Sequence, residues 1–200
     1  MEPALTLLLA YLIGSIPVTW LIFYWRTGRD LRAAGDGNVG SANAIRSGAG
    51  FLWGRLALLA DVGKGLLAVS LARWFNLEIG WWVAAGFLVM VGHMFPVWLR
   101  FQGGRAAATA MGAAGAFVPW QFGICFAAAT AAFLLLKIAE LGILIVAAPL
   151  PFIAIAWNLP AAAIAFTFAA PVLAALKAAF DYWYRSRRRP PARDPAESRA

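Results

Sequence analysis

The apolar run PALTLLLAYLIGSIPVTWLIFYW, residues 3–25, decides the fold class of this chain. It is longer than the roughly 20 residues that an α-helix needs to cross the hydrocarbon core of a bilayer. No charged residue interrupts it, and Arg26, Arg29 and Arg32 follow it. No basic segment precedes it and no small-residue cleavage site follows it, so we interpret it as a first membrane span and not as a signal peptide.

The whole chain has the composition of an integral membrane protein. Of its 200 residues, 62% are hydrophobic and 13% are charged, and its mean hydropathy is +0.73. A soluble domain of this length would need far more surface charge. The soluble alternative is therefore disfavoured.

The net charge of +8 indicates membrane topology and not a nucleic-acid partner. The basic residues are concentrated in the gaps between apolar runs, as the positive-inside rule describes, and are not spread over one soluble face. With the N-terminus outside, every Lys and Arg except Arg73 lies in or near a cytoplasmic segment. We predict this orientation, with the C-terminus in the cytoplasm.

The remaining apolar runs predict an all-α polytopic membrane protein of about seven transmembrane helices with two Gly-rich cytoplasmic loops. Pro119 divides a run that is too long for one span, so we expect one short helix before it and another helix after it. The predicted spans are residues 3–25, 51–75, 79–99, 106–136 in two parts, 141–156 and 160–180. They form one domain, residues 1–183, followed by a basic tail, residues 184–200, that we expect to be disordered.

The first polar gap, residues 26–50, contains more glycine and polar residues than a connecting loop needs. It contains GDGNVGSANAIR, residues 35–46. Glycines allow successive backbone N–H groups to converge on an anion, and the planar guanidinium of Arg46 can grip two phosphate oxygens. An ordinary flexible loop is the alternative, because Gly and Asn are also turn formers.

The second polar gap, residues 92–112, places Gly103 and Gly104 directly before a run of Ala and Thr that we expect to be helical. Arg105 then lies in the first turn of a helix, where a positive charge is disfavoured unless an anion is bound. This pattern favours phosphate binding. The alternative is a topology-setting arginine beside glycines that allow close helix packing.

His93 and Cys125 are the only histidine and the only cysteine, which excludes His-pair and Cys-cluster metal sites. His93 could hold a Pro-broken helix by bonding a backbone carbonyl, or act as a general acid or base. Asp61 and Lys64 lie on one face of a predicted membrane helix. Because such charges are costly in a membrane, we expect a structural pair or a substrate contact.

Several motifs together resemble those of the bacterial acyl-phosphate:glycerol-3-phosphate acyltransferase family. Their order and spacing agree over residues 11–112. The similar segments are GSIP (14–17), GRDLRAAGDGNVGSANAIR (28–46; family form DIRxxGSGNxGATNxxR), DVGKG (61–65; DxxKG) and GHMFPVWLRFQGGRAAAT (92–109; GHxFPxxxxFxGGKGVAT).

The resemblance implies a seven-helix bacterial inner-membrane enzyme of phospholipid synthesis. Such enzymes move a fatty acyl group from acyl phosphate to the 1-hydroxyl of glycerol 3-phosphate, giving lysophosphatidic acid and inorganic phosphate. No metal and no organic cofactor is implied. The implied partners are acyl phosphate, glycerol 3-phosphate or a related polyol phosphate, membrane lipid and an enzyme that makes acyl phosphate.

The motifs and the chemistry together predict the site residues. The enzyme must hold two anions and an acyl chain in attack geometry and stabilise developing negative charge. We predict catalytic roles for Arg46, Arg105 and His93. The predicted substrate-binding residues are Asp36, Gly37, Asn38, Gly40, Ser41, Asn43, Lys64, Gly103, Gly104 and Thr109.

The chain also departs from the family pattern. Asp36 replaces a serine, Ala42 a threonine and Arg105 a lysine, and the family's third motif is missing from LKAAFDYWYRSRRR, residues 176–189. Lys177 and Asp181 are the only candidates to replace part of that motif. The alternatives are therefore a different acceptor, a paralog that binds acyl phosphate or lipid without turnover, or a small anion transporter, which the lack of an evident inverted repeat disfavours.

Overall fold

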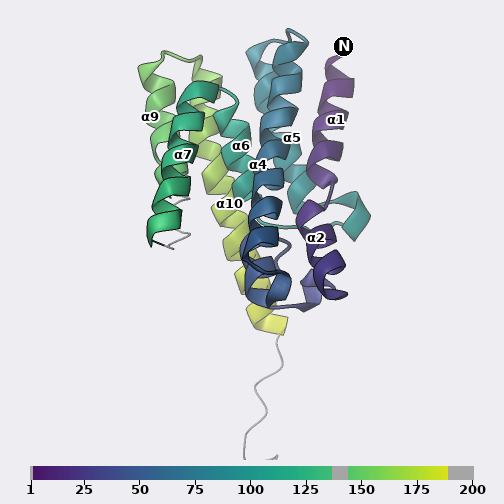
Figure 1. Cartoon of the computed structure of the whole chain (residues 1–200). Coiled ribbons are helices and arrows are strands. Elements are labelled where there is room, and N and C mark those ends of the chain that lie inside the picture. The colour runs from purple at the N-terminus through teal and green to yellow at the C-terminus, as the bar shows by residue number, and fades with distance from the viewer. Residues whose placement is uncertain (1, 137–143, 189–200) are drawn as a thin grey trace, which may run out of the picture.

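The structure is a computed structural model that describes residues 2–136 and 144–188. All regular elements in these two ranges are helical, which confirms the predicted all-α class (Figure 1). The helices are α1 (Pro3–Ser15), α2 (Val18–Thr27), η1 (Leu31–Ala33), α3 (Ser41–Ala44), η2 (Ile45–Ala49), α4 (Phe51–Trp74), α5 (Ile79–Met94), η3 (Val97–Leu99), α6 (Ala107–Gly115), α7 (Pro119–Leu136), α9 (Pro149–Ala156) and α10 (Ala161–Arg188).

The first predicted span is two helices, where we expected one. Pro17 forces the residue before it away from the helical region, and Ile16 accordingly has φ −60° and ψ 115°. The break frees backbone carbonyls that lipid could not satisfy. Lys64 of α4 donates to the Ile16 carbonyl at 2.9 Å and to the Gly14 carbonyl at 3.3 Å, so a buried ammonium caps the end of α1.

Three helical segments in the described ranges are long and apolar enough to cross a membrane: Pro3–Thr27, Ile79–Leu99 and Ala161–Arg187. A shorter apolar helix covers Leu144–Ala156. Residues 141–143 of the span predicted there lie outside the described residues. The count of seven spans therefore stays a prediction.

The expected break at Pro119 is confirmed, because α6 ends at Gly115 and α7 begins at Pro119. The last helix differs from the prediction. It continues to Arg188, beyond the expected end at residue 180, so residues 184–188 of the predicted tail are helical. Residues 189–200 lie outside the described part of the chain.

Glycines bring the central helices into close contact. A Cβ on Gly14 of α1 would meet the Val89 backbone of α5, and one on Gly92 of α5 would meet the Tyr11 carbonyl of α1. In the same way, a Cβ on Gly65 of α4 would meet the Thr109 carbonyl of α6. Such small-residue contacts replace the hydrophobic driving force that lipid does not provide.

The two polar gaps lie toward one end of this helix bundle. Figure 1 shows the start of α1 at the top, with the end of α2, the start of α4 and the end of α10 at the bottom. A small apolar cluster that includes Phe23, Leu31, Val39 and Leu99 packs both gaps against α2. This cluster fixes the position of the polar residues described next.

Candidate active site

The first glycine loop, residues 28–50, is folded around the fully buried side chain of Asn43. The Asn43 amide nitrogen donates to the carbonyls of Ala34 at 3.0 Å and Asn38 at 2.9 Å. Its side-chain oxygen accepts from the Asp36 N–H at 3.1 Å and the Ser47 hydroxyl at 3.2 Å. The Asn43 side chain thus satisfies loop backbone groups that a regular helix or sheet would pair with each other.

Asp36 stands between two glycines in left-handed conformations, Gly35 at φ +56° and Gly37 at φ +70°. A Cβ would collide with Asn43 at the first position and with Arg185 at the second. The Asp36 carboxylate also accepts the Asn38 N–H through Oδ1 at 3.0 Å. The backbone therefore restricts this carboxylate to one region of the loop surface.

The Asp36 carboxylate lies between two predicted catalytic arginines. Its Oδ2 is 3.4 Å from Nη2 of Arg46 and 3.3 Å from Nη2 of Arg105. Arg185, from the last turns of α10, donates to the Asp36 carbonyl. Three segments that are distant in sequence meet at this one residue.

The second glycine loop, residues 95–106, uses its glycines for close approach and not for a left-handed turn. The N–H groups of Gly103 and Gly104 donate to the carbonyls of Met94 and His93, both at 3.1 Å. A Cβ on Gly104 would collide with His93 Nε2 and the Val39 carbonyl. Arg105 follows, just before α6, and Ala106 at φ +60° turns the chain into that helix.

A buried polar cluster lies beneath the two glycine loops, formed by Thr19, Asp61, Lys64 and His93. Asp61 accepts from the Thr19 hydroxyl at 2.7 Å and pairs with Lys64 at 2.8 Å. His93 Nδ1 is 3.3 Å from the Lys64 ammonium and 3.6 Å from Asp61 Oδ1. No carboxylate lies near His93 in the sequence, whereas the fold brings Asp61 next to it.

Lys64 is fully engaged in this cluster and its surroundings. An ammonium has three N–H donors, and Lys64 faces Asp61, His93 and the two carbonyls at the α1–α2 break. This arrangement directs the Lys64 ammonium at protein groups, and substrate binding by Lys64 stays a prediction.

The last helix brings Lys177, Asp181 and Arg185 to the site at intervals of four residues, on one face. Lys177 pairs with Asp181 Oδ1 at 2.5 Å. Asp181 Oδ2 is buried and has no hydrogen-bond partner among the described residues. The sequence analysis placed Arg185 in the basic tail expected to be disordered, although its four-residue spacing from Asp181 could have placed it on this face.

Two overlapping cavities lie beside the glycine loops. The polar cavity, of about 440 Å³, is lined by three basic side chains, by Asp181 and by several aromatic rings. Its basic residues are Arg32, Lys177 and Arg185. A more open cavity of about 270 Å³ shares Arg32, Gly37 and Arg185 with it and includes Asp36.

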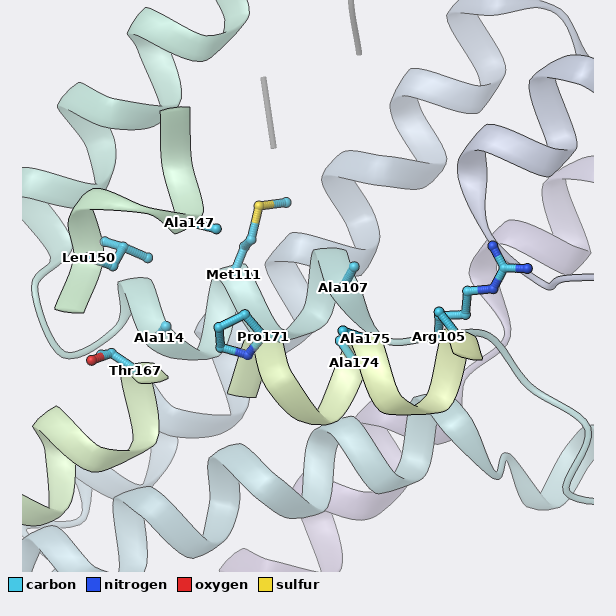
Figure 2. Close-up of a pocket in the computed structure, with 12 residues that line it drawn as sticks. Arg105, Ala107, Met111, Ala114, Ala147, Leu150, Thr167, Pro171, Ala174 and Ala175 are labelled. Atoms are coloured by element: carbon cyan, nitrogen blue, oxygen red, sulfur yellow. The ribbon is translucent and has the colours of Figure 1, made fainter. Parts of the chain in front are cut away.

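The apolar cavity, of about 230 Å³, runs between α6, α9 and α10 and is lined mainly by alanines. Figure 2 shows Arg105 at one end of the lining side chains and Leu150, Ala114 and Thr167 at the other. Arg105 is thus the point where a charged group meets this apolar space.

The Asp30–Arg32 pair anchors the first glycine loop beside the site. Arg32 Nη2 lies 2.6 Å from Asp30 Oδ2, and the Trp20 indole donates to Asp30 at 2.8 Å. The hydrogen bond from Arg32 is the main reason that the pKa of Asp30 falls to about 2, and the same contact raises the pKa of Arg32. Arg32 also donates to the Leu99 carbonyl at 3.1 Å, which ties the two glycine loops together.

The structure separates the predicted site residues into three groups. Asp36, Arg46 and Arg105 meet directly, and His93 and Lys64 lie in the buried polar cluster beneath them. The remaining residues shape the loops or pack the helices: Gly37, Asn38, Gly40, Ser41, Asn43, Gly103, Gly104 and Thr109, of which Thr109 is fully buried. No group of three or more His, Cys, Asp or Glu side chains that could hold a metal occurs in the described ranges.

Comparison with known proteins identifies the family. The family model for glycerol-3-phosphate acyltransferase matches residues 4–186. The chain belongs to this family. The resemblance seen in the motifs is therefore confirmed, and the match extends beyond the motif-bearing residues to the last helix.

Similar family members are bacterial. Glycerol-3-phosphate acyltransferases of Dehalococcoides mccartyi (strain CBDB1) and Prochlorococcus marinus (strain MIT 9313) are 43% and 44% identical over 109 and 102 residues, 54% and 51% of this chain. The chain spans about half the length of these two curated relatives, 47% and 50%. The glycerol-3-phosphate acyltransferase of Parasynechococcus marenigrum (strain WH8102) is 38% identical over 72% of this chain and 67% of its own length.

The fold is that of a solved membrane protein. The crystal structure of PlsY, an integral membrane glycerol 3-phosphate acyltransferase, in its glycerol 3-phosphate form matches with a TM-score of 0.74 and 26% identity, over 88% of this chain and 87% of that chain. Its lysophosphatidic acid form matches with a TM-score of 0.71 and 24% identity over the same shares. These matches agree with the membrane-protein interpretation of the composition.

Proposed function

We propose that this protein transfers a fatty acyl group from acyl phosphate to the 1-hydroxyl of glycerol 3-phosphate, giving lysophosphatidic acid and inorganic phosphate. Family membership supports this reaction. So do the glycerol 3-phosphate and lysophosphatidic acid forms of PlsY, which shares the fold.

The position of Arg105 is the observation that carries the proposal. Its guanidinium lies with Arg46 at the Asp36 carboxylate, and its side chain also lines the apolar cavity. An acyl phosphate has the same two parts, an anionic head and an apolar chain. We place the chain in the apolar cavity and the phosphate at the two arginines.

We place the acceptor in the polar cavity. Arg32, Lys177 and Arg185 make this cavity basic, which suits a phosphate group. Oδ2 of Asp181 has no hydrogen-bond partner among the described residues and can accept a hydrogen bond from an acceptor hydroxyl. This assignment gives Lys177 and Asp181 part of the role of the missing third motif.

The reaction needs positioning more than covalent catalysis. The acceptor hydroxyl oxygen attacks the acyl carbonyl carbon, the bond from that carbon to the phosphate oxygen breaks, and the ester forms. The hydroxyl proton passes to the leaving phosphate. Arg46 and Arg105 stabilise the negative charge that grows on the phosphate.

We assign His93 and Lys64 positioning roles. Both are enclosed in the buried polar cluster, and His93 supports Gly104 from below. Asn43 and the glycines of the first loop fix the loop backbone, which positions the Asp36 carboxylate beside the arginines. The proposed location is the bacterial inner membrane with a cytoplasmic site, and an enzyme that makes acyl phosphate is the proposed supplier of the donor.

The test is a product assay with the purified full chain in lipid nanodiscs. Labelled acyl phosphate and glycerol 3-phosphate should give labelled lysophosphatidic acid in proportion to protein. If no product forms with glycerol 3-phosphate or with other polyol phosphates, the proposed reaction is wrong. Binding of acyl phosphate without turnover would instead support a non-catalytic paralog, which the Asp36 carboxylate between the two arginines favours.

A further inference from the structure

The Asp36 carboxylate occupies the place where two guanidiniums would meet an anion. One oxygen, Oδ2, faces Nη2 of both Arg46 and Arg105, at 3.4 Å and 3.3 Å. Two guanidiniums that converge on one oxygen match the geometry of a bound phosphate. In this chain, a side chain of the protein itself is the anion.

This contact is looser than a structural ion pair in the same loop. Asp30 and Arg32 approach to 2.6 Å, and Asp30 also accepts from Trp20 and from the Arg32 backbone. The Asp36 contacts with Arg46 and Arg105 are both longer than the distances usual for a charge-assisted hydrogen bond. Arg46 is 61% exposed and Asp36 is 34% exposed, so solvent screens the pairs. An incoming anion can therefore displace the carboxylate from the arginines.

The loop nevertheless keeps Asp36 close after such a displacement. Gly35 and Gly37 fix the backbone on either side, and Asn43 holds the Asp36 N–H. The Asn38 N–H holds the other carboxylate oxygen, Oδ1. A bound phosphate would remain next to a negative charge, which a serine or asparagine at this position would not supply.

We propose that Asp36 is a specificity-determining residue, an internal anion that competes with phosphate for Arg46 and Arg105. It weakens the binding of inorganic phosphate to the free enzyme. If the proposed acyl transfer is correct, Asp36 also limits inhibition by the phosphate product. That consequence rests on the proposed function, whereas the competition itself does not.

The first experiment measures phosphate binding directly. Inorganic phosphate is titrated calorimetrically into the purified full chain at pH 7 and constant ionic strength, for the wild type, Asp36→Asn and Asp36→Ser. The two variants should bind phosphate at least about tenfold more tightly than the wild type, because each removes one full negative charge beside the anion. Glu78→Gln, which removes a negative charge from the loop before α5, is the matched control and should bind like the wild type.

Equal or weaker phosphate binding by both Asp36 variants would overturn the proposal. So would undetectable binding in all proteins. Loss of the folded state in both variants, measured by thermal unfolding, would also overturn it, since Asp36 would then be needed for the loop and not for selectivity.

The second experiment measures phosphate inhibition of acyl transfer in the same proteins. The inhibition constant should fall at least about tenfold in Asp36→Asn, in step with the tighter binding. If no protein makes lysophosphatidic acid, the proposed function fails, while the calorimetric result still decides whether Asp36 competes with phosphate.

Discussion

At the scale of single residues, Arg105 belongs both to the charged group around Asp36 and to the apolar cavity. Among the described residues that line the apolar cavity it alone carries a charge, and its guanidinium also reaches Asp36. The sequence predicted its importance from an unfavourable charge in the first turn of a helix, whereas the structure places Arg105 just before α6. What the sequence could not give was the pairing with Asp36, because the two residues are 69 positions apart.

Arg105→Ala should lower kcat/KM for acyl transfer at least about tenfold. Loss of one charge-assisted hydrogen bond in the transition state, worth about 1.4 kcal/mol or more, accounts for this factor. Arg100→Ala is the matched control, because Arg100 is an exposed arginine of the same loop. Equal rates for the two variants in the product assay would contradict the proposed catalytic role of Arg105.

Asp30 should make a pH-dependent contribution to stability. Its pKa is about 2 in the folded chain against an ordinary value of 3.8, so its stabilising effect is present above pH 3.8 and is lost as the pH falls towards 2. Asp30→Asn should therefore lower the melting temperature at pH 7 and have a smaller effect near pH 2.5. Thermal unfolding in detergent at both pH values checks this, and an equal difference at the two pH values would contradict it.

At the scale of helices, interruptions of the membrane spans create the polar interior. The break at Pro119 could be predicted, because the apolar run around it exceeds one span. The break at Pro17 was missed, because residues 3–25 have the right length for one helix. Only the structure shows that Lys64 caps the freed carbonyls, a compensation that comes from another helix.

Two glycines of α4 provide a matched test of helix packing. Gly65→Ala should destabilise the fold by about 1–3 kcal/mol, because its Cβ would overlap the backbone of α6. Gly63→Ala should be neutral or stabilise by up to about 1 kcal/mol, because no described atom beyond its own stretch of helix lies within 4 Å of its Cβ position and alanine favours helix. Thermal unfolding of both variants measures the difference. Similar melting temperatures would show that α4 and α6 can separate at low cost.

At the scale of the whole molecule, the polar groups that the site uses are gathered toward one end of the bundle. Composition and motif order predicted a helical membrane protein with two important loops, and the structure agrees. The sequence could not predict that Asp61 meets His93, since these residues are 32 positions apart on separate helices, α4 and α5. It also could not predict that Gly103 and Gly104 pack closely against His93, and their assignment to phosphate stays a prediction.

The predicted orientation can be tested with single cysteines. In a Cys125→Ala background, Glu78→Cys should react with a membrane-impermeant maleimide added to intact cells. Arg29→Cys should react only after the membrane is permeabilised, because the first glycine loop is predicted to face the cytoplasm. If Arg29→Cys reacts in intact cells and Glu78→Cys reacts only after permeabilisation, the topology is the reverse of the predicted one and the candidate site faces outside.

The contact from Arg185 to Asp36 has a consequence for biosynthesis. Asp36 and Arg46 leave the ribosome early, but the side chain that holds the Asp36 carbonyl is translated almost 150 residues later, the two positions being 149 apart. The first glycine loop therefore lacks its full set of contacts until α10 is inserted. A nascent chain halted before that helix should lack this contact, so the proposed acyl transfer should begin only after α10 has been made.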